Sequence, residues 1–331
     1  MTGKARPRDE ELLAALRGAF AAAGLDEPER VRRRRSEYWT SFPLERLTVR
    51  DRSGQETRLA FKRVEWEAMH ADARLAKPRF LHDPRREAAV YASVLPAAPA
   101  GPPRYLGSTD AGRDGTWLFV EWIDGRSLVE HEYGGPWLDA ARWLGALHVA
   151  TSADLDRHAE RGRLMRADGF GYLRWLERAR RFAAARDRRH PSLSFLGWLA
   201  GRYGAVVEEL GALPLTVVHG DFYPANVLVA NGAGAPRVAP VDWESAAVAP
   251  GLLDLAALVS GGWTERERAE LAAAYASVPG VPRFEPRKLD LARLHVAVQW
   301  LGWAPPPWSP PQGQRHDWLA DATAIAEGLD L

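Results

Sequence analysis

Two carboxylates and one amide stand at fixed spacings around short apolar runs. Residues 217–229 read as a strand, a polar loop and a second strand, and the loop holds Asp221 and, five residues later, Asn226. Sixteen residues beyond Asn226, Asp242 ends another apolar run. In phosphoryl transfer, one carboxylate orients and deprotonates the attacking hydroxyl, while an amide oxygen and a second carboxylate hold Mg²⁺ against the phosphates. Hard oxygen ligands suit Mg²⁺, so the pattern predicts a phosphoryl-transfer site.

With their neighbours, these residues read His219-Gly220-Asp221, four residues, Asn226, and then Asp242-Trp243-Glu244. The set resembles the aminoglycoside phosphotransferase and choline kinase superfamily, whose members are small-molecule kinases with a protein-kinase-like fold. The resemblance implies that Asp221 is the catalytic base and that Asn226 and Asp242 are the Mg²⁺ ligands. The alternative is a hairpin whose polar loop only caps itself, since Asp and Asn are ordinary turn residues. Turn chemistry does not explain the spaced set of three.

Three further residues are assigned supporting roles. His219 would hold the geometry of the loop rather than shuttle protons, and Glu244 could act through a metal-bound water. Asp254 lies near the start of an apolar helix and reads first as a helix cap. The resemblance implies instead that Asp254 braces the catalytic loop from below.

Lys62 interrupts an apolar strand at residues 59–64. In the kinase layout, a strand lysine binds the α- and β-phosphates of ATP and is held by a glutamate on the following helix. Glu87 is our choice of partner, although Glu65 and Glu67 are nearer in sequence. The alternative for Lys62 is an edge-strand lysine whose ammonium group reaches solvent.

The phosphate loop and the hinge carry weaker signals. Residues 38–43 stand where a Gly-rich loop would cover the phosphates, but they are not Gly-rich. Ser41 or backbone N–H groups could contact a phosphate there, as turn amides commonly do. Glu121, Trp122 and Ile123 fit the hinge, where backbone groups would meet the adenine edge, although Trp122 could equally cover the edge of the core.

The pattern of elements predicts an α+β, two-lobed, protein-kinase-like fold. The N-terminal lobe, residues 1–122, would hold an N-terminal helix, a small five-stranded antiparallel sheet and one helix carrying Glu87. Residues 123–331 would form a larger, mainly helical lobe with the catalytic loop, the metal-binding loop and the acceptor site. The expected helices include residues 9–23, a helix from 136, and helices at 193–210 and 317–329; residues 31–38 are either an exposed helix end or an edge strand.

Composition narrows the class of protein. The 331 residues carry a net charge of +1, so nothing global points to nucleic acid or a membrane surface. The 40 Arg against four Lys read as coding bias, and a solvated charged face explains the Arg run at 32–35 better than nucleic-acid binding does. There is no Cys, the first ten residues lack the apolar core expected of a signal peptide, and no run approaches the length of a membrane span. We expect a cytoplasmic monomer or homodimer.

The predicted activity is ATP-dependent transfer of a phosphoryl group, with Mg²⁺ and with GTP as a possible donor, to a hydroxyl of a small molecule. An antibiotic, a sugar and another natural product or metabolite are the acceptors considered, so antibiotic resistance and metabolism both stay open. Residues 154–190, the expected acceptor wall, hold 11 Arg against six Asp or Glu, which weighs against a polycationic aminoglycoside. The alternative function is a catalytically weak, nucleotide-binding regulatory module.

Overall fold

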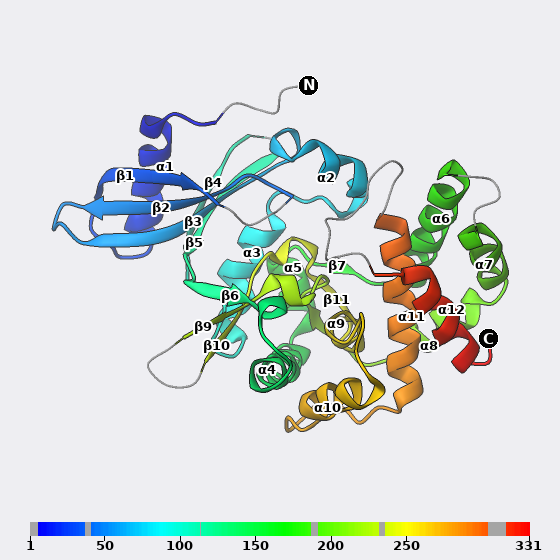
Figure 1. Cartoon of the computed structure of the whole chain (residues 1–331). Coiled ribbons are helices and arrows are strands. Elements are labelled where there is room, and N and C mark those ends of the chain that lie inside the picture. The colour runs from blue at the N-terminus through cyan, green and yellow to red at the C-terminus, as the bar shows by residue number, and fades with distance from the viewer. Residues whose placement is uncertain (1–5, 37–40, 113, 187–190, 232–235, 304–315) are drawn as a thin grey trace.

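A five-stranded antiparallel sheet forms the N-terminal part of the molecule (Figure 1). The computed structural model describes residues 6–36, 41–112, 114–186, 191–231, 236–303 and 316–331. The strand order is β1-β2-β3-β5-β4. The bounds are β1 Pro28–Arg35, β2 Leu44–Asp51, β3 Glu56–Glu65, β4 Tyr105–Asp110 and β5 Gly115–Glu121. The Arg-rich tract at 31–38 is therefore the edge strand β1 as far as residue 35, and this settles the alternative left open by its sequence.

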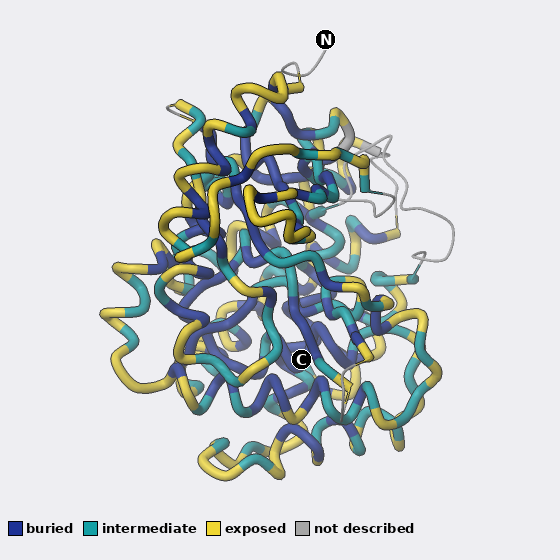
Figure 2. The backbone as a smooth tube through the Cα atoms, turned by 90° about the vertical axis from the view of Figure 1, so that its left-hand side faces the viewer, coloured by how far each residue is buried: buried dark blue, intermediate teal, exposed yellow. Residues whose placement is uncertain are grey.

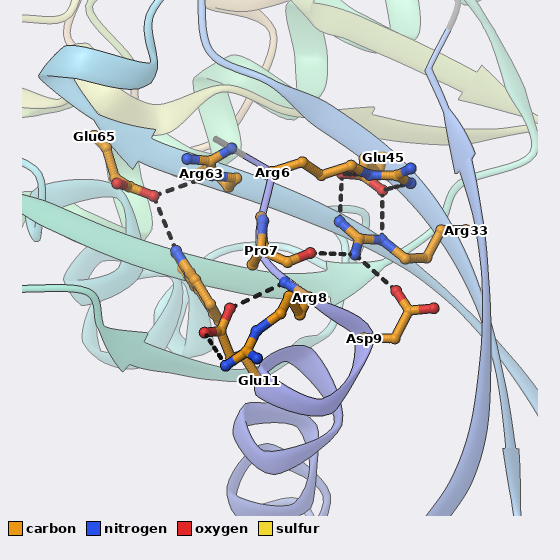
Figure 3. A network of polar contacts seen from close by, with 10 residues as sticks. Arg6, Pro7, Arg8, Asp9, Glu11, Arg33, Glu45, Arg63 and Glu65 are labelled. Carbon is orange, nitrogen blue, oxygen red and sulfur yellow. Dashed lines mark hydrogen bonds and ion pairs between the residues drawn. The ribbon is translucent and has the colours of Figure 1, made fainter. Parts of the chain in front are cut away.

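Helix α1, Asp9–Ala22, covers the outer face of this sheet. Its buried side chains pack against Phe61 and Phe119, whose rings stack at 5.2 Å between centroids. A polar network fastens the start of the helix: the Arg33 guanidinium donates two hydrogen bonds to Glu45, each of 2.8 Å, and one to the backbone oxygen of Pro7 (Figure 3). The opposite face of the sheet is thus left to meet the helical part.

A folded connection joins β3 to the helix that carries Glu87. It contains the short helices η1 (Trp66–Ala68), α2 (Ala71–Ala76) and η2 (Arg79–Leu81). Helix α3, Arg86–Ser93, follows and then η3, Leu95–Ala97. Glu87 lies in the first turn of α3 and is buried.

The C-terminal part is mainly helical, with the buried residues concentrated along the inner faces of its helices (Figure 2). One continuous core joins these helices to α3. The elements are β6 (Gly125–Ser127), η4 (Leu128–Glu130), α4 (Gly135–Ser152), α5 (Leu155–Arg161), β7 (Met165–Arg166), α6 (Gly169–Arg186), α7 (Pro191–Ala200), α8 (Tyr203–Gly211), α9 (Leu252–Leu258), α10 (Glu265–Ala276), α11 (Pro286–Trp303) and α12 (Trp318–Gly328).

Two small sheets hold the loops of chemical interest. The first has the order β10-β9-β6 and the second β7-β11-β8. The remaining strands are β8 (Leu215–Val218), β9 (Val227–Ala230), β10 (Arg237–Pro240) and β11 (Ala247–Pro250), with η5 (Pro224–Asn226) and η6 (Trp243–Ser245) between them. Because β9 pairs with β10 and β8 pairs with β11, the loops after β8 and after β10 meet at one place.

The structure corrects one expected helix. Residues 193–210 are not continuous: α7 ends at Ala200 and α8 begins at Tyr203. Gly201 stands at the break, and the backbone N–H of Arg202 bonds the oxygen of Leu199 in a tight turn. Glycine is a poor helix former because it gains conformational freedom outside the helix.

In the described ranges, no helix is both long and apolar enough to cross a membrane.

Candidate active site

The loop after β8 presents Asp221 and ties it to Asn226. The Asn226 amide nitrogen donates to a carboxylate oxygen of Asp221 at 2.8 Å and to its backbone oxygen at 2.9 Å. The short helix η5 ends at Asn226 and turns its side chain back toward Asp221. The five-residue spacing read from the sequence is therefore the length of one short helical turn plus its entry.

The loop after β10 brings Asp242 to the same place. The backbone N–H of Val241 donates to the backbone oxygen of Asn226 at 2.9 Å, so the two loops are joined next to both predicted metal ligands. His219 is fully buried, and its Nε2 lies 2.9 Å from the oxygen of Val241. Asp242 has a φ of 67°, a left-handed conformation that Asp adopts more readily than most residues.

Asp254 holds the loop before Asp221 from within the core. It is 1% exposed, and its two carboxylate oxygens accept hydrogen bonds from the backbone N–H groups of His219 (2.6 Å) and Gly220 (2.9 Å). Asp254 lies in the first turn of α9, whose N-cap is Gly251. Its carboxylate thus binds backbone donors of the loop that precedes Asp221, rather than capping its own helix.

Lys62 extends from the sheet to Asp242, one of the two predicted metal ligands. Its ammonium nitrogen lies 2.6 Å from Asp242 Oδ1 and 2.7 Å from Glu87 Oε2. The nearer candidates in sequence have other partners: Glu65 binds Arg63 and Trp117, and Glu67 pairs with Arg74. The structure therefore brings Lys62, Glu87 and Asp242 together across 180 residues of chain.

A second lysine, which the sequence analysis did not single out, enters the site. Lys77 follows α2 directly, is 4% exposed, and forms a close ion pair with Glu244. The ammonium nitrogens of Lys77 and Lys62 lie 4.9 and 5.7 Å from the ring centroid of the fully buried Phe42. The scarcity of lysine was the available signal, because two of the four lysines in the chain converge here.

Crowded carboxylates govern the electrostatics of the site. Burial raises the pKa of Asp221 to about 7, and the charges of Asp242 and Glu244 add to this effect. Burial likewise raises the pKa of Glu87 to about 7, although Lys62 opposes the rise. Burial acts to raise the pKa of Asp242, but the charge and hydrogen bond of Lys62 outweigh it and hold that pKa below its usual range. A carboxyl with a pKa near neutrality suits a general base.

The donors present suit a Mg²⁺ ion. Asn226 uses its amide nitrogen for Asp221, and Asp242 uses Oδ1 for Lys62, so each still has an oxygen to offer. The group contains four carboxylates: Glu87, Asp221, Asp242 and Glu244. Only two ammonium groups, those of Lys62 and Lys77, take part in the ion pairs described above, so the carboxylates outnumber them. In the described ranges, no group of three or more His, Cys, Asp or Glu residues forms a cation site. Few protein ligands and a surplus of negative charge are the conditions that Mg²⁺ meets beside phosphates.

The predicted hinge borders a cavity of about 710 Å³. Its lining includes Ser36, Arg46, Trp122, Ile123 and Val229, so it opens between the strands β1 and β2 and the end of β5. The carboxylate of Glu121 is held by Arg237 at 2.7 and 2.9 Å. The backbone N–H groups of Glu121 and Trp122 donate to the oxygens of Arg104 and Arg58.

Ser41 stands apart from these contacts. Its backbone oxygen accepts a hydrogen bond from the N–H of His70 at 3.1 Å. Residues 38–40 of the expected phosphate loop lie outside the described residues. Ser36 and Leu44 join across this connection, since the N–H of Ser36 donates to the oxygen of Leu44 at 3.0 Å. The connection therefore runs between two neighbouring strands of the sheet.

An aromatic cluster that includes Tyr223 lies two residues after Asp221. The ring of Tyr223 meets that of Trp300 at 5.0 Å, and Trp300 stacks on Trp318 at 5.2 Å. Burial and the nearby Asp221 carboxylate raise the pKa of Tyr223. Trp308 and the segment 312–314 lie outside the described residues. The aromatic cluster is thus an apolar wall beside the catalytic loop.

Comparison with known proteins gives a family match. A model of the phosphotransferase enzyme family matches residues 48–292, which run from β2 into α11. No curated protein matches the chain.

Solved structures show the fold. A GDP complex of aminoglycoside 2'-phosphotransferase-IIIa matches with a TM-score of 0.59 at 14% identity, covering 97% of this chain and 98% of the other. Macrolide 2'-phosphotransferase MphH from Brachybacterium faecium gives 0.54 at 20%, covering 95% and 97%. A choline/ethanolamine kinase family protein from Mesorhizobium loti gives 0.53 at 19%, covering 87% and 90%. These matches confirm the α+β, two-lobed, protein-kinase-like fold.

Proposed function

The chain belongs to the phosphotransferase enzyme family, as its motifs predicted, and we propose that it transfers the γ-phosphoryl group of ATP to a hydroxyl of a small molecule. The observation that carries the proposal is the convergence of Lys62, Asp221 and Asp242 from three separate elements. A nucleotide-binding module without chemistry has no physical need for both a base and metal ligands.

The nucleotide would lie between the sheet and the helical part. Backbone groups of residues 121–123 would meet the base at the edge of the cavity of about 710 Å³. Lys62, oriented by Glu87 at 2.7 Å, would hold the α- and β-phosphates. Mg²⁺, which would be held by Asn226 and Asp242, neutralises charge on the phosphates when it is bound.

Asp221 would accept a hydrogen bond from the acceptor hydroxyl and take its proton as the phosphoryl group transfers. Its hydrogen bond from Asn226 orients the carboxylate, and its raised pKa of about 7 places proton uptake within reach at neutral pH. His219 and Asp254 would keep the backbone of this loop in place. Most of the acceleration would come from positioning and charge neutralisation.

The acceptor we propose is a neutral, amphipathic or anionic hydroxyl compound. Tyr223 and Trp300 offer an apolar surface beside Asp221. On the neighbouring helix α6, Arg174 lies over the ring of Phe80 at 3.7 Å, and residues 154–190 hold 11 Arg against six Asp or Glu. An excess of positive charge there would disfavour a polycationic acceptor.

The first test is thermal unfolding with and without ATP, each with and without Mg²⁺. A ligand that binds only the folded state raises the melting temperature by mass action. We expect a rise that needs Mg²⁺ in the natural chain and that fades in Asp242→Asn. Absence of any rise with millimolar ATP or GTP would contradict the proposal.

Turnover is then measured against sugars, macrolides, aminoglycosides, choline and ethanolamine. Asp221→Asn should lower turnover by about 10²–10⁴-fold, the usual contribution of a general base, while the ATP-dependent rise in melting temperature remains. Asp156→Asn is the matched control, since Asp156 has a 96% exposed side chain. Near-full turnover in Asp221→Asn would show that the base is another residue.

A further inference from the structure

Lys77 is a buried cation that the proposed mechanism does not use. It comes from the connection between β3 and α3, where its N–H closes the last turn of α2 on the oxygen of Ala73 at 2.8 Å. Its side chain is 2% exposed and meets Glu244, two residues beyond the metal-side Asp242. A buried lysine is costly unless a partner compensates its charge, so its retention calls for an account.

Neighbouring elements hold Lys77 at the junction of the nucleotide and acceptor sides. Arg178 of α6 donates to the oxygen of Ala76 at 2.5 Å and to that of Gly302 at 2.7 Å. Phe80 packs edge-on against Trp175 with 5.9 Å between ring centroids. Two contacts, at Ala76 and Phe80, therefore join the Lys77 segment to α6, and Arg178 joins α6 in turn to α11, which carries Trp300, while the ammonium group of Lys77 points to Glu244.

The charge of Lys77 acts on both carboxylates of the proposed reaction. Burial and neighbouring carboxylates raise the pKa of Asp221, and Lys77 opposes that rise. Asp242 feels the same cation after the larger effect of Lys62. The geometry agrees: Lys77 pairs with Glu244, two residues beyond Asp242, and its ammonium nitrogen shares the ring of Phe42 with that of Lys62.

We infer that Lys77 binds the terminal phosphoryl group of the nucleotide, exchanging Glu244 for that group when the triphosphate enters. This role rests on the proposed function. Lys62 would hold the α- and β-phosphates, and a triphosphate carries more charge than one lysine can balance. Lysine is a compact point charge that suits phosphate oxygens. In a chain that otherwise uses 40 Arg, lysine stands at both positions.

The test compares the affinities of ADP and of the non-hydrolysable β,γ-imido analogue of ATP, both with Mg²⁺. Lys77→Met should weaken binding of the triphosphate analogue by about tenfold or more, the loss expected for one charged hydrogen bond, and change ADP binding by less than about twofold. Lys62→Met should weaken both ligands. Lys288→Met is the matched control, because Lys288 also pairs with a glutamate, Glu209 at 2.8 Å, on the surface.

Glu244→Gln provides a test of opposite sign that leaves Lys77 in place. Without its counter-ion, Lys77 should prefer the triphosphate analogue over ADP more strongly than in the natural chain. If Lys77→Met folds poorly, this variant still decides the question. Equal losses for both ligands in Lys77→Met, or only a lower melting temperature, would assign Lys77 a structural role and overturn the inference. If the natural chain binds neither nucleotide, the proposed function fails and the inference fails with it.

Discussion

At the scale of single residues, Gly220 is a position where the loop that carries Asp221 has no room for a side chain. It has a φ of 77°, and a Cβ atom there would stand 2.2 Å from the backbone oxygen of Ser245. Real Cβ atoms do not approach a backbone oxygen so closely, so the loop after β10 would have to move. Because that loop carries Asp242, the movement would separate the two sides of the site.

We expect Gly220→Ala to lower the free energy of unfolding by about 3 kcal/mol, since the left-handed backbone and the contact each add strain, and to lower turnover at least about tenfold. Gly54→Ala is the control for backbone strain alone, because Gly54 has a φ of 90° and its nearest atom is the flexible Arg50 guanidinium at 3.5 Å. Denaturant unfolding compares the two. Equal losses of stability in both variants would show that the contact with Ser245 is unimportant.

Residue types and spacing predicted the contact between Asp221 and Asn226 but not the one between Lys77 and Glu244. Asp221 and Asn226 are joined within one loop, so their spacing alone indicated that they would meet. Glu87 was chosen over nearer glutamates from a family pattern, and the structure places it against Lys62. Lys77 could not be found this way, because its position depends on how an irregular connection runs past Phe42 and α6.

At the scale of elements, Arg86 joins helix α3 to the loop after β10, which carries Asp242 and Glu244. Its guanidinium is buried and donates to the backbone oxygens of Leu81 (2.8 Å), Arg163 (3.0 Å) and Glu244 (2.8 Å). Three segments from different parts of the chain thus share one donor. The position of Glu87, the next residue on α3, depends on this junction.

Arg86→Met should lower the free energy of unfolding by on the order of 3 kcal/mol, because buried carbonyl oxygens lose a charged donor and have no water to replace it. Arg85→Met is the matched control on the preceding residue. Arg85 pairs with Asp110 at 2.7 Å on the surface, and exposed ion pairs contribute less than about 1 kcal/mol. Urea unfolding of both variants decides, and equal effects would contradict the junction role.

Elements with strong periodicity were predicted well, while breaks and short connections were not. Helix α1 ends within one residue of its predicted bound, because an apolar face and Gly24 mark it clearly. The break between α7 and α8 was missed because the apolar pattern continues across it and only Gly201 signals the interruption. The short helices η1, α2 and η2 have too few residues to show a period at all.

At the scale of the whole molecule, two hydrophobic cores lie on opposite faces of the sheet. Helix α1 closes one around Phe61 and Phe119, while α3 and the β5 residues Leu118 and Val120 belong to the core of the helical part. Only the inner face of the sheet, with Lys62, is left facing the carboxylate loops. The order of strands and helices predicted the two-lobed fold, which the solved structures confirm, and the family model covers residues 48–292.

Two of the four lysines converge on one site, so chemical labelling of lysine can report whether a nucleotide occupies that site. An acyl phosphate of ATP carries a reactive acyl group on its terminal phosphate and passes it to an amine that the phosphate touches. We expect acylation at Lys62 and Lys77, lost when excess ATP competes, with Lys288 as the unlabelled internal reference read by peptide mass spectrometry. Acylation of Lys288 to the same extent, or labelling indifferent to ATP, would contradict the site. A protein so poor in lysine can thus show, peptide by peptide, which amines lie near the bound terminal phosphate.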